Sequence, residues 1–376
     1  MSRILYKSSK GYQIKNHSYS GGSLWDFCSR KYQYKKLDGW QEREDGPALA
    51  FGNSFEAAHT YYHVHGREKG SGVEEWKLNW FRHRDSPDIK YTDKSGTWED
   101  LLRVGVEMMR LYEVTLPSLP IMNEEFQVKR VVDLFPHTPE YEGLGYDARA
   151  DILCTVPNGH PLLPPLDGGP TRRLIIDVKT SGNPYPSDPR MSALDPQLID
   201  YSWVFDIPTV AFLVFVKNPS GHTTGDWVTA LTGDHAGKSY IAYDINEERT
   251  LVLPKTIYDE MSERKKEIKG KGSKERLESL EAEYFYRALR FDPQDLTKQK
   301  IQFLPAVIDQ ETRDDAHQVA RNEAMEIADS YSANFFPKNP GIRFPNRKCP
   351  ECAYRGLCLR DEALTKELLV KIDGTF

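Results

Sequence analysis

Leu174-Ile175-Ile176-Asp177-Val178-Lys179 is the stretch of this sequence that decides the fold. Its apolar residues predict a buried strand, which ends in a carboxylate and an amine before the loop residues Thr180-Ser181-Gly182. Side chains two residues apart in a strand point to the same face. We therefore expect Asp177 and Lys179 to project together from one side of a sheet.

A second carboxylate stands in another predicted strand, Ala150-Asp151-Ile152-Leu153-Cys154-Thr155-Val156. If the two strands pair, Asp151 joins Asp177 and Lys179 at one site. Two carboxylates can hold Mg²⁺ or Mn²⁺, the metal can activate a water, and the lysine can stabilise developing charge. The alternative is an ordinary surface pair of Asp and Lys at a strand end.

The order of the predicted elements indicates an α/β protein with a mixed sheet and helices packed against it. Helices are expected over residues 20–37, 49–65, 98–114, 195–205 and 310–334, and strands over 126–134, 150–156, 174–179 and 210–216. Residues 218–236 are expected to form a loop. Residues 255–290 are highly charged and predict an exposed helix pair.

Composition excludes some classes of protein. No apolar run approaches the roughly 20 residues of a membrane helix, and the first seven residues contain no signal-peptide core. We therefore expect a cytoplasmic protein without membrane contact. The net charge of −6 does not indicate nucleic-acid binding, but nucleases concentrate carboxylates at their sites, so it does not exclude DNA as a partner.

The cysteines favour metal binding or catalysis over disulfides, because five in a large cytoplasmic chain do not suit a disulfide framework. Cys349, Cys352 and Cys358 form a C-x2-C-x5-C cluster, and Cys28 lies far upstream. Four cysteines can hold a [4Fe–4S] cluster or Zn²⁺, and spacing alone does not separate these. Either would join the N-terminus to the C-terminus. Cys154 lies in the middle of a strand and is expected to be a buried apolar residue.

Three motifs follow one another in the order typical of a known family. Residues 145–153 resemble its second motif, Asp177-Val178-Lys179 its third, and Gln197-Leu198-Ile199-Asp200-Tyr201 its Q-x3-Y helix. With Cys28-Ser29-Arg30-Lys31-Tyr32 and the C-terminal cysteines, the chain resembles the P-D-(D/E)-x-K nuclease superfamily in its RecB-like iron–sulfur branch. That branch includes the CRISPR-associated exonuclease and the nuclease domains of helicase–nucleases.

The resemblance implies a restriction-endonuclease-like mixed central sheet flanked by helices, with a helical iron–sulfur cap that joins the two ends of the chain. It implies four regions: a helical segment at 1–48, a nuclease core at 49–217, an insertion at 218–309, and a C-terminal helix with the cysteine cluster at 310–376. It further implies a [4Fe–4S] cluster on Cys28, Cys349, Cys352 and Cys358, with Zn²⁺ as the alternative.

The same resemblance assigns roles at the carboxylates. Asp151, Asp177 and the carbonyl of Val178 would hold Mg²⁺ or Mn²⁺, and Lys179 would assist the attacking water. Gln197 and Tyr201 would position the scissile strand.

The family's first motif, G-x3-H, differs in this chain. Glu56 stands where similar proteins carry the metal-binding His, and His59 follows one turn later. Glu56 is the favoured ligand, since an oxygen ligand suits Mg²⁺ or Mn²⁺, and His59 is the alternative. Glu124 and Glu125 are further acidic candidates, although a solvated loop is favoured for both.

Two functions remain open. One is a metal-dependent DNA exonuclease that acts on single strands or free ends in recombination or repair, in a bacterial, archaeal or phage-infected cell. The other is a protein that binds DNA ends for a recombinase, helicase or integrase without cutting them. The departure at Glu56 favours the second function, and the intact Asp177-x-Lys179 pair favours the first.

Overall fold

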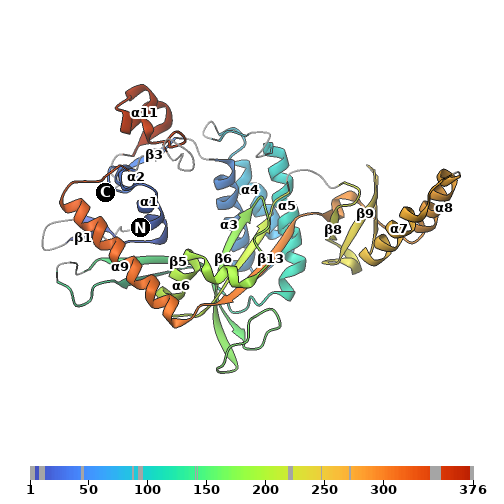
Figure 1. The fold of residues 1–376 in the computed structure, drawn as a ribbon, viewed down its shortest axis with the longest axis horizontal. Helices are drawn as coiled ribbons and strands as arrows, with labels where there is room; N and C mark the ends of the chain where they lie inside the picture. Colours follow the sequence, from blue (N-terminus) through green and yellow to red (C-terminus); the bar gives the residue numbers. More distant parts are fainter. Residues whose placement is uncertain are drawn as a thin grey trace.

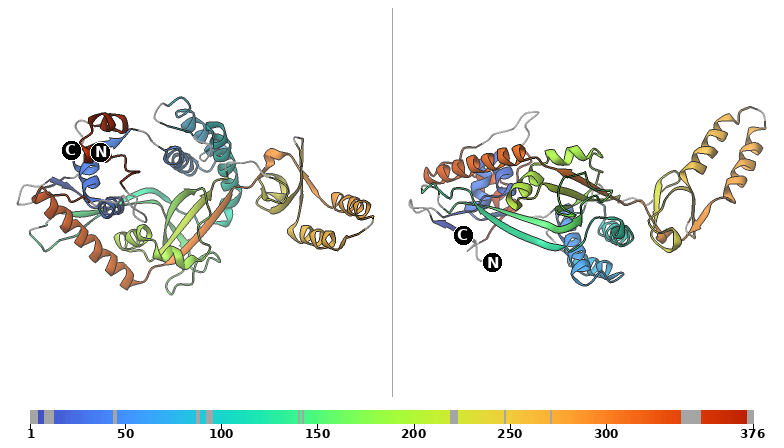
Figure 2. Two further views of the ribbon diagram at one scale, coloured as in Figure 1. Left: turned by 45° about the horizontal axis from the view of Figure 1, so that its top comes forward. Right: turned by 90° about the horizontal axis from the view of Figure 1, so that it is seen from below.

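The computed structural model describes residues 5–7, 13–43, 46–86, 89–91, 96–139, 141, 143–218, 223–246, 248–270, 272–338 and 349–372. Figure 1 shows a central sheet with helices packed against it and a smaller unit that projects from one end of the molecule. Figure 2 shows from two further sides that helices lie on both faces of this sheet. The mixed α/β class expected from the sequence is confirmed.

The central sheet has the strand order β13-β7-β6-β5-β4. Its strands are β4 (Glu125–Asp133), β5 (Gly145–Pro157), β6 (Thr171–Ser181), β7 (Thr209–Val216) and β13 (Lys300–Val307). Strands β6 and β7 are parallel, and the other pairs are antiparallel. Every residue of β7 is buried, as its uninterrupted apolar sequence predicts for a strand covered on both faces.

Three helices cover one face of the sheet: α3 (Pro47–Val64), α4 (Ser71–Phe81) and α5 (Trp98–Thr115). Helix α3 begins at a proline, and α5 begins with a capping box between Thr97 and Asp100, which are both standard start signals. Helices α4 and α5 pack closely at Gly105 of α5 and Trp76 of α4. A Cβ added to Gly105 would lie 2.0 Å from the Trp76 ring, so this contact requires a glycine. The expected helices at 49–65 and 98–114 are confirmed.

The other face is covered by α6 (Pro196–Phe205) and α9 (Gln310–Ser332). Asp195 caps α6, because its Oδ1 accepts hydrogen bonds from the amides of Gln197 and Leu198, at 3.0 and 3.2 Å. Pro196 occupies the first helical position, where its missing amide hydrogen has no cost. The sequence therefore fixes where α6 begins and which residues its first turn presents.

The N- and C-terminal parts of the chain meet. The single helix expected over residues 20–37 is wrong, because Cys28 adopts an extended backbone with φ of −171° and separates two helices. The elements of the two ends are β1 (Leu5–Lys7), β2 (Gln13–Lys15), α1 (Tyr19–Phe27), α2 (Ser29–Tyr32), a π-helical turn (Gln33–Leu37), β3 (Trp40–Glu42), α10 (Arg355–Leu359), α11 (Glu362–Leu368) and β14 (Leu369–Lys371). Strand β14 pairs with β3, so backbone hydrogen bonds tie the two ends together.

The projecting unit is a second sheet with a helical arm (Figure 1). It consists of β8 (Trp227–Ala230), β9 (Ser239–Ile245), β10 (Thr250–Leu253), β11 (Leu289–Phe291), β12 (Leu296–Thr297), α7 (Lys255–Glu267) and α8 (Ser273–Phe285). The charged helix pair is present as expected, and ion pairs such as Arg264 with Glu283, at 2.7 Å, link its two helices.

Two expectations for this region are corrected. Residues 218–236 were expected to form a loop, but they contain β8, whose partners lie elsewhere in the second sheet. The expected insertion at 218–309 extends too far, because β13 lies within it and pairs with β7 in the central sheet. Among the residues described above, none of the helices is long and apolar enough to cross a membrane.

Candidate active site

Two carboxylates lie where the ladder between β5 and β6 ends. Ile152 pairs with Ile176, and Asp151 and Asp177 are the next residues on their strands. Asp151 reaches across to β6, where its Oδ2 accepts a hydrogen bond of 2.8 Å from the amide of Val178. The expected pairing of the two strands is confirmed, and it brings both carboxylates to one place.

Lys179 links this pair to α6. Its Nζ lies 2.7 Å from Asp177 Oδ2 and donates a hydrogen bond of 2.9 Å to Gln197 Oε1. Gln197 Nε2 in turn donates to Asp177 Oδ1 at 3.1 Å and lies 2.6 Å from the Tyr201 hydroxyl. Asp177, Lys179 and Gln197 thus form a closed ring of contacts. Gln197 and Tyr201 reach it together because residues four apart share a helix face.

Glu56 of α3 also lies at this site, and its contact is with a residue that the sequence did not single out. Gln127 of β4 donates a hydrogen bond to Glu56 Oε1. The backbone of Gln127 has φ of +53°, although its neighbours Phe126 and Val128 pair regularly with β5. A positive φ is uncommon for a residue other than glycine and tends to mark functional positions. No pattern in the sequence predicts it, because Gln127 stands inside an ordinary strand motif.

The electrostatics of the site follow from burial. Burial, followed by the negative charges of Asp177 and Glu56, raises the pKa of Asp151 to about 7, although the Val178 amide opposes this shift. Burial raises the pKa of Asp177 to about 6, although Lys179 beside it lowers the value. Burial alone would lower the pKa of Lys179, but the adjacent carboxylates raise it above its usual range. Lys179 therefore carries a positive charge, and this charge only partly offsets the negative charges of the carboxylates around it.

Tyr185 is a second residue that the sequence analysis missed. Burial raises its pKa, and the charges of Lys179, Asp177 and the neighbouring Tyr19 also act on it. Its backbone is held by Gln302 of β13, which bonds both its amide, at 2.8 Å, and its carbonyl, at 3.0 Å. The sequence could not predict that Tyr185 lies near the site, because its position depends on hydrogen bonds between its backbone and Gln302 of β13.

His59 does not lie with the carboxylates. Its ring packs against Tyr112 and Phe215 in the core beneath α3, with centroids 4.6 and 6.0 Å away. Burial, and then the neighbouring His63, lowers the pKa of His59 well below its usual value. Glu56 acts on the pKa of both aspartates, whereas His59 is not among the groups that do so. The structure thus places Glu56 at the site and His59 in the core.

The other acidic candidates have different environments. Glu124 accepts hydrogen bonds from His63, at 2.9 Å, and from Arg67, at 2.6 Å, in a cluster at the end of α3. Glu125 is exposed at the start of β4. Glu124 therefore has a structural role, and neither residue joins the carboxylate pair.

The four expected cluster cysteines lie in the part of the molecule where the chain ends meet. Burial chiefly raises the pKa of Cys352, and the thiols of Cys358 and Cys28 add to the shift. Burial likewise raises the pKa of Cys358, with smaller contributions from Cys28 and Cys349. The two ends of the chain therefore bring these thiols within electrostatic range of one another. Cys154 is buried in the core, as expected.

The side chains as placed do not form a closed ligand shell. Within the described ranges, no group of three or more His, Cys, Asp or Glu side chains is arranged to hold a metal ion. This applies both to the carboxylates and to the cysteines. The assignment of either set to a metal rests on its chemistry and its charge balance.

Comparison with known proteins adds little. No family model matches the chain, and no curated protein is similar to it. The crystal structure of SSO0001 is similar to 46% of this chain and to 62% of that chain, at 13% sequence identity and a TM-score of 0.18. The match thus spans less than two thirds of that protein, and a likeness at this score carries no argument.

The burial of His59 predicts how stability depends on pH. Because its folded pKa lies below the unfolded value of roughly 6.5, the unfolded chain binds the extra proton as the pH falls through that value. The contribution of His59 to the free energy of unfolding should therefore decrease below about pH 6.5, by up to about 1.4 kcal/mol per pH unit. Asp151 and Asp177, whose pKa values are raised, contribute in the opposite direction over the same range, so the contribution of His59 is the difference between the wild type and a variant without the imidazole. Urea unfolding between pH 5 and pH 8 measures this slope.

His59→Leu should lose less stability than the wild type as the pH falls from 8 to 5, since it removes the buried titrating group and keeps an apolar side chain of similar size. His137→Leu is the matched control, because His137 is exposed and its replacement should leave the slope unchanged. An unaltered slope in His59→Leu would contradict the burial of a neutral imidazole at this position.

Proposed function

We propose that the chain is a Mg²⁺- or Mn²⁺-dependent deoxyribonuclease on a restriction-endonuclease-like fold, similar to the P-D-(D/E)-x-K nucleases of the RecB-like iron–sulfur branch. The observation that carries the proposal is the ring of contacts among Asp177, Lys179 and Gln197, with Asp151 beside it. These are the residue types that the family's motifs require. They come from the adjacent strands β5 and β6 and from helix α6, which follow one another in the chain in the same order as the family's motifs.

The donor set suits a divalent cation. Asp151, Asp177 and Glu56 are three carboxylates near one another, and Lys179 pairs with Asp177. Carboxylate oxygens are the ligands that Mg²⁺ and Mn²⁺ prefer. The raised pKa values of the two aspartates indicate that the site would gain from added positive charge. These residues, with the Val178 carbonyl, would hold the ion.

A bound Mg²⁺ or Mn²⁺ would lower the pKa of a coordinated water and offset charge that develops on the attacked phosphate. The chain's own contribution is to position a fixed cation beside that phosphate. Lys179 Nζ is held by Asp177 and Gln197, and the lysine side chain remains 30% exposed, so it is accessible to a substrate. Tyr201 supports Gln197 through their 2.6 Å contact and so helps to orient the lysine.

We further propose that Cys28, Cys349, Cys352 and Cys358 hold a [4Fe–4S] cluster, with Zn²⁺ as the alternative. The proximity of Cys28 to Cys352 and Cys358 supports this proposal, since these residues are far apart in the sequence. The pairing of β3 with β14 brings the same two ends together. The cluster would act as a structural staple, because it lies outside the carboxylate site.

The proposed substrate is single-stranded DNA or DNA with free ends, processed in recombination or repair. Its partners would be a recombinase, helicase or integrase, and its location the cytoplasm. These assignments rest on the family resemblance. They set the substrates for the test that follows.

Lys179→Ala should reduce Mn²⁺-dependent degradation of single-stranded DNA by about 100-fold or more, the usual effect of removing a preorganised charge donor. Lys300→Ala is the matched control, since it removes an exposed lysine from the start of β13 and should leave the rate unchanged. Gel assays with 5′- or 3′-blocked oligonucleotides measure the rate and the polarity. Circular dichroism checks that both variants fold.

Equal rates for Lys179→Ala and the wild type would contradict the proposed site. A wild-type protein that binds DNA but never cleaves it would instead favour the non-cleaving function in end binding and assembly.

Wild-type protein purified without oxygen should be brown and contain iron and acid-labile sulfide. Cys28→Ala should lose both, because it removes the one ligand that the N-terminal segment supplies. Cys154→Ala is the control and should keep the colour, since Cys154 is buried in the sheet. A colourless wild-type protein with stoichiometric zinc would rule out the iron–sulfur assignment.

A further inference from the structure

A cavity of about 460 Å³ adjoins the candidate active site. Its lining shares Gln127, Gln197 and Tyr201 with that site. The remaining lining residues are Ser18, Tyr19, Ser20, Lys129, Asp147, Ala148 and Arg149. The volume lies within the range of roughly 300–1,000 Å³ typical of small-ligand pockets. A molecule in this cavity would therefore lie directly beside the carboxylates.

The wall formed by β4 and β5 carries an unfavourable pair of charges. Lys129 and Arg149 are direct partners across the two strands, and like charges opposite one another destabilise a sheet. Asp147 offsets one of them, because its Oδ2 lies 2.6 Å from Lys129 Nζ. Arg149 is exposed and forms no ion pair with any residue that the structure describes. A positive charge on the cavity lining that has no ion pair among the described residues suits an anionic ligand.

The opposite wall is aromatic. Tyr19, at the start of α1, and Tyr201, on α6, both line the cavity. Tyr19 also lies close enough to Tyr185 to act on its pKa, so it stands near the loop that follows Lys179. Aromatic rings beside basic residues form the combination that binds single-stranded nucleic acid, with bases on the rings and phosphates on the cations.

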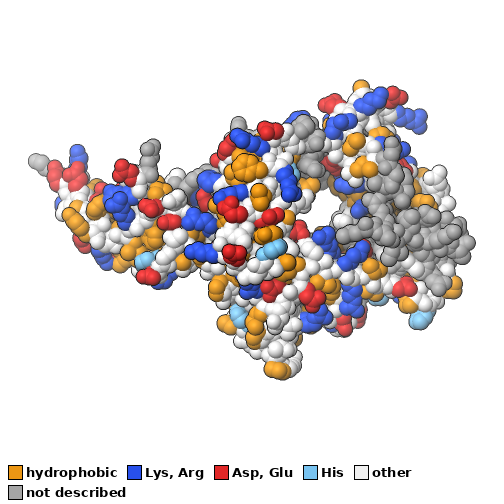
Figure 3. Space-filling view, turned by 180° about the vertical axis from the view of Figure 1, so that it is seen from behind, with side chains coloured by type: hydrophobic (Ala, Val, Ile, Leu, Met, Phe, Trp, Pro, Cys, Tyr) orange, Lys and Arg blue, Asp and Glu red, His pale blue; other side chains and the backbone are white. Residues whose placement is uncertain are grey.

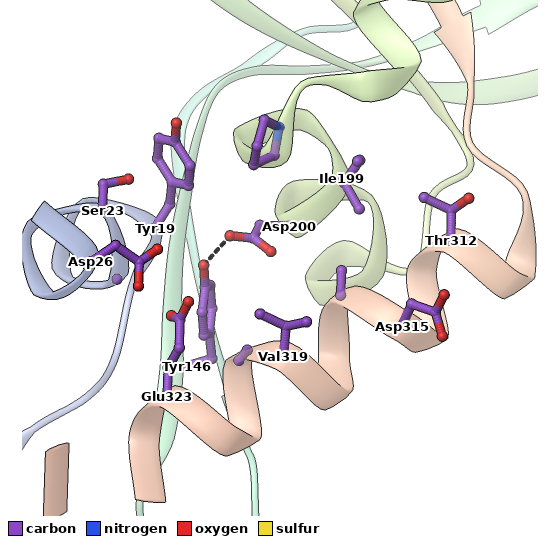
Figure 4. A pocket seen from close by; sticks show the side chains of 14 residues that line it. Tyr19, Ser23, Asp26, Tyr146, Ile199, Asp200, Thr312, Asp315, Val319 and Glu323 are labelled. Atoms are coloured by element: carbon purple, nitrogen blue, oxygen red, sulfur yellow. Dashed lines mark hydrogen bonds between the residues drawn. The ribbon is translucent and has the colours of Figure 1, made fainter. Parts of the chain in front are cut away.

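A second cavity, of about 380 Å³, also has Tyr19 in its lining, and its charged lining residues are all acidic. Figure 4 shows the side chains of Asp26, Asp200, Asp315 and Glu323 around it, with Tyr19 on the same wall. Four carboxylates there would repel a phosphate backbone. Of the two cavities that Tyr19 lines, the one beside the carboxylates of the candidate site contains the basic residues.

Basic side chains also gather on one face of the molecule. Figure 3 shows a hollow between the helices α3–α5 and the part of the molecule that carries α11, with Lys and Arg side chains gathered beside it.

We propose that the cavity beside the carboxylates holds one unpaired nucleotide of the DNA strand next to the bond that is cut. Arg149 binds its phosphate, and Tyr19 packs against its base. This inference rests on the proposed nuclease function and deepens it, because a space of this size admits a single nucleotide and excludes a duplex. Tyr19 and Arg149 are then positioning residues that set the preference for single strands.

Oligonucleotides with one abasic residue, moved along the strand, test the inference. In the wild type, one abasic position near the cut should raise KM about tenfold, which is the size of one base–aromatic stacking contact. In Tyr19→Ala the abasic residue at that position should not raise KM further, because the stacking ring is already absent. Tyr19→Phe should respond as the wild type does, because it keeps the ring. Arg149→Ala should raise KM about tenfold on every substrate and weaken its dependence on salt.

Arg173→Ala is the matched control, because Arg173 is an exposed arginine at the other end of β6 and should leave KM unchanged. The inference is overturned if Tyr19→Ala keeps the wild-type response to the abasic residue, or if Arg149→Ala behaves as Arg173→Ala. The affinity of the same oligonucleotides, followed by fluorescence anisotropy with Ca²⁺, gives a second readout. A wild type that binds without cutting would refute the nuclease while the affinities still decide whether the cavity holds a nucleotide.

Discussion

The shortage of positive charge around Asp151 and Asp177 is the constraint on which the rest of the site depends. Burial raises the pKa values of both carboxyl groups, and the negative charge of Asp177 raises that of Asp151 further. Lys179 offsets part of this charge at Asp177, and the Val178 amide offsets part of it at Asp151. Gln197, Tyr201 and Gln127 then make sense as groups that hold the charged side chains in place.

Such a site requires a rigid scaffold, because buried charge weakens the fold around it. The scaffold is asymmetric. On one face, stacked aromatic rings of α3 and α4, among them Phe51, Trp76 and Trp80, fill the space against β7. On the other face, α6 is fixed at its start by Asp195 and presents its polar side chains to the site. The apolar face supplies stability, and the capped helix supplies the polar groups.

The sequence predicted the parts of the site that depend on local patterns. The apolar run before Asp177 predicted β6, and the spacing of Gln197 and Tyr201 predicted their shared helix face. The left-handed backbone of Gln127 could not be predicted, because the residue stands inside an ordinary strand pattern. The burial of His59 was equally hidden, since α3 carries polar residues on more than one face. Strand β13 was missed because its partner β7 lies far away in the sequence.

The difference between local patterns and long-range pairing also explains why the second sheet was not predicted. Strand β8 has short local signals and pairs with strands that follow it after intervening turns, so the segment 218–236 resembled a loop. Contacts to α5 then hold the unit in place, with Thr297 and Gln299 both bonded to Glu107. Local patterns therefore identified residues that lie together at the candidate site, and long-range pairing decided the boundaries of the two sheets.

The measurement that tests the central claim most directly is the thermal stability of the metal-free protein as Mn²⁺ is added. The wild type should melt at a temperature that rises with Mn²⁺ concentration, because the ion binds the folded carboxylates and not the unfolded chain. Asp177→Asn should melt higher than the wild type without metal, since it removes a buried charge, and should lose most of the response to Mn²⁺. An unchanged melting temperature in the wild type, or an equal response in the variant, would contradict the account.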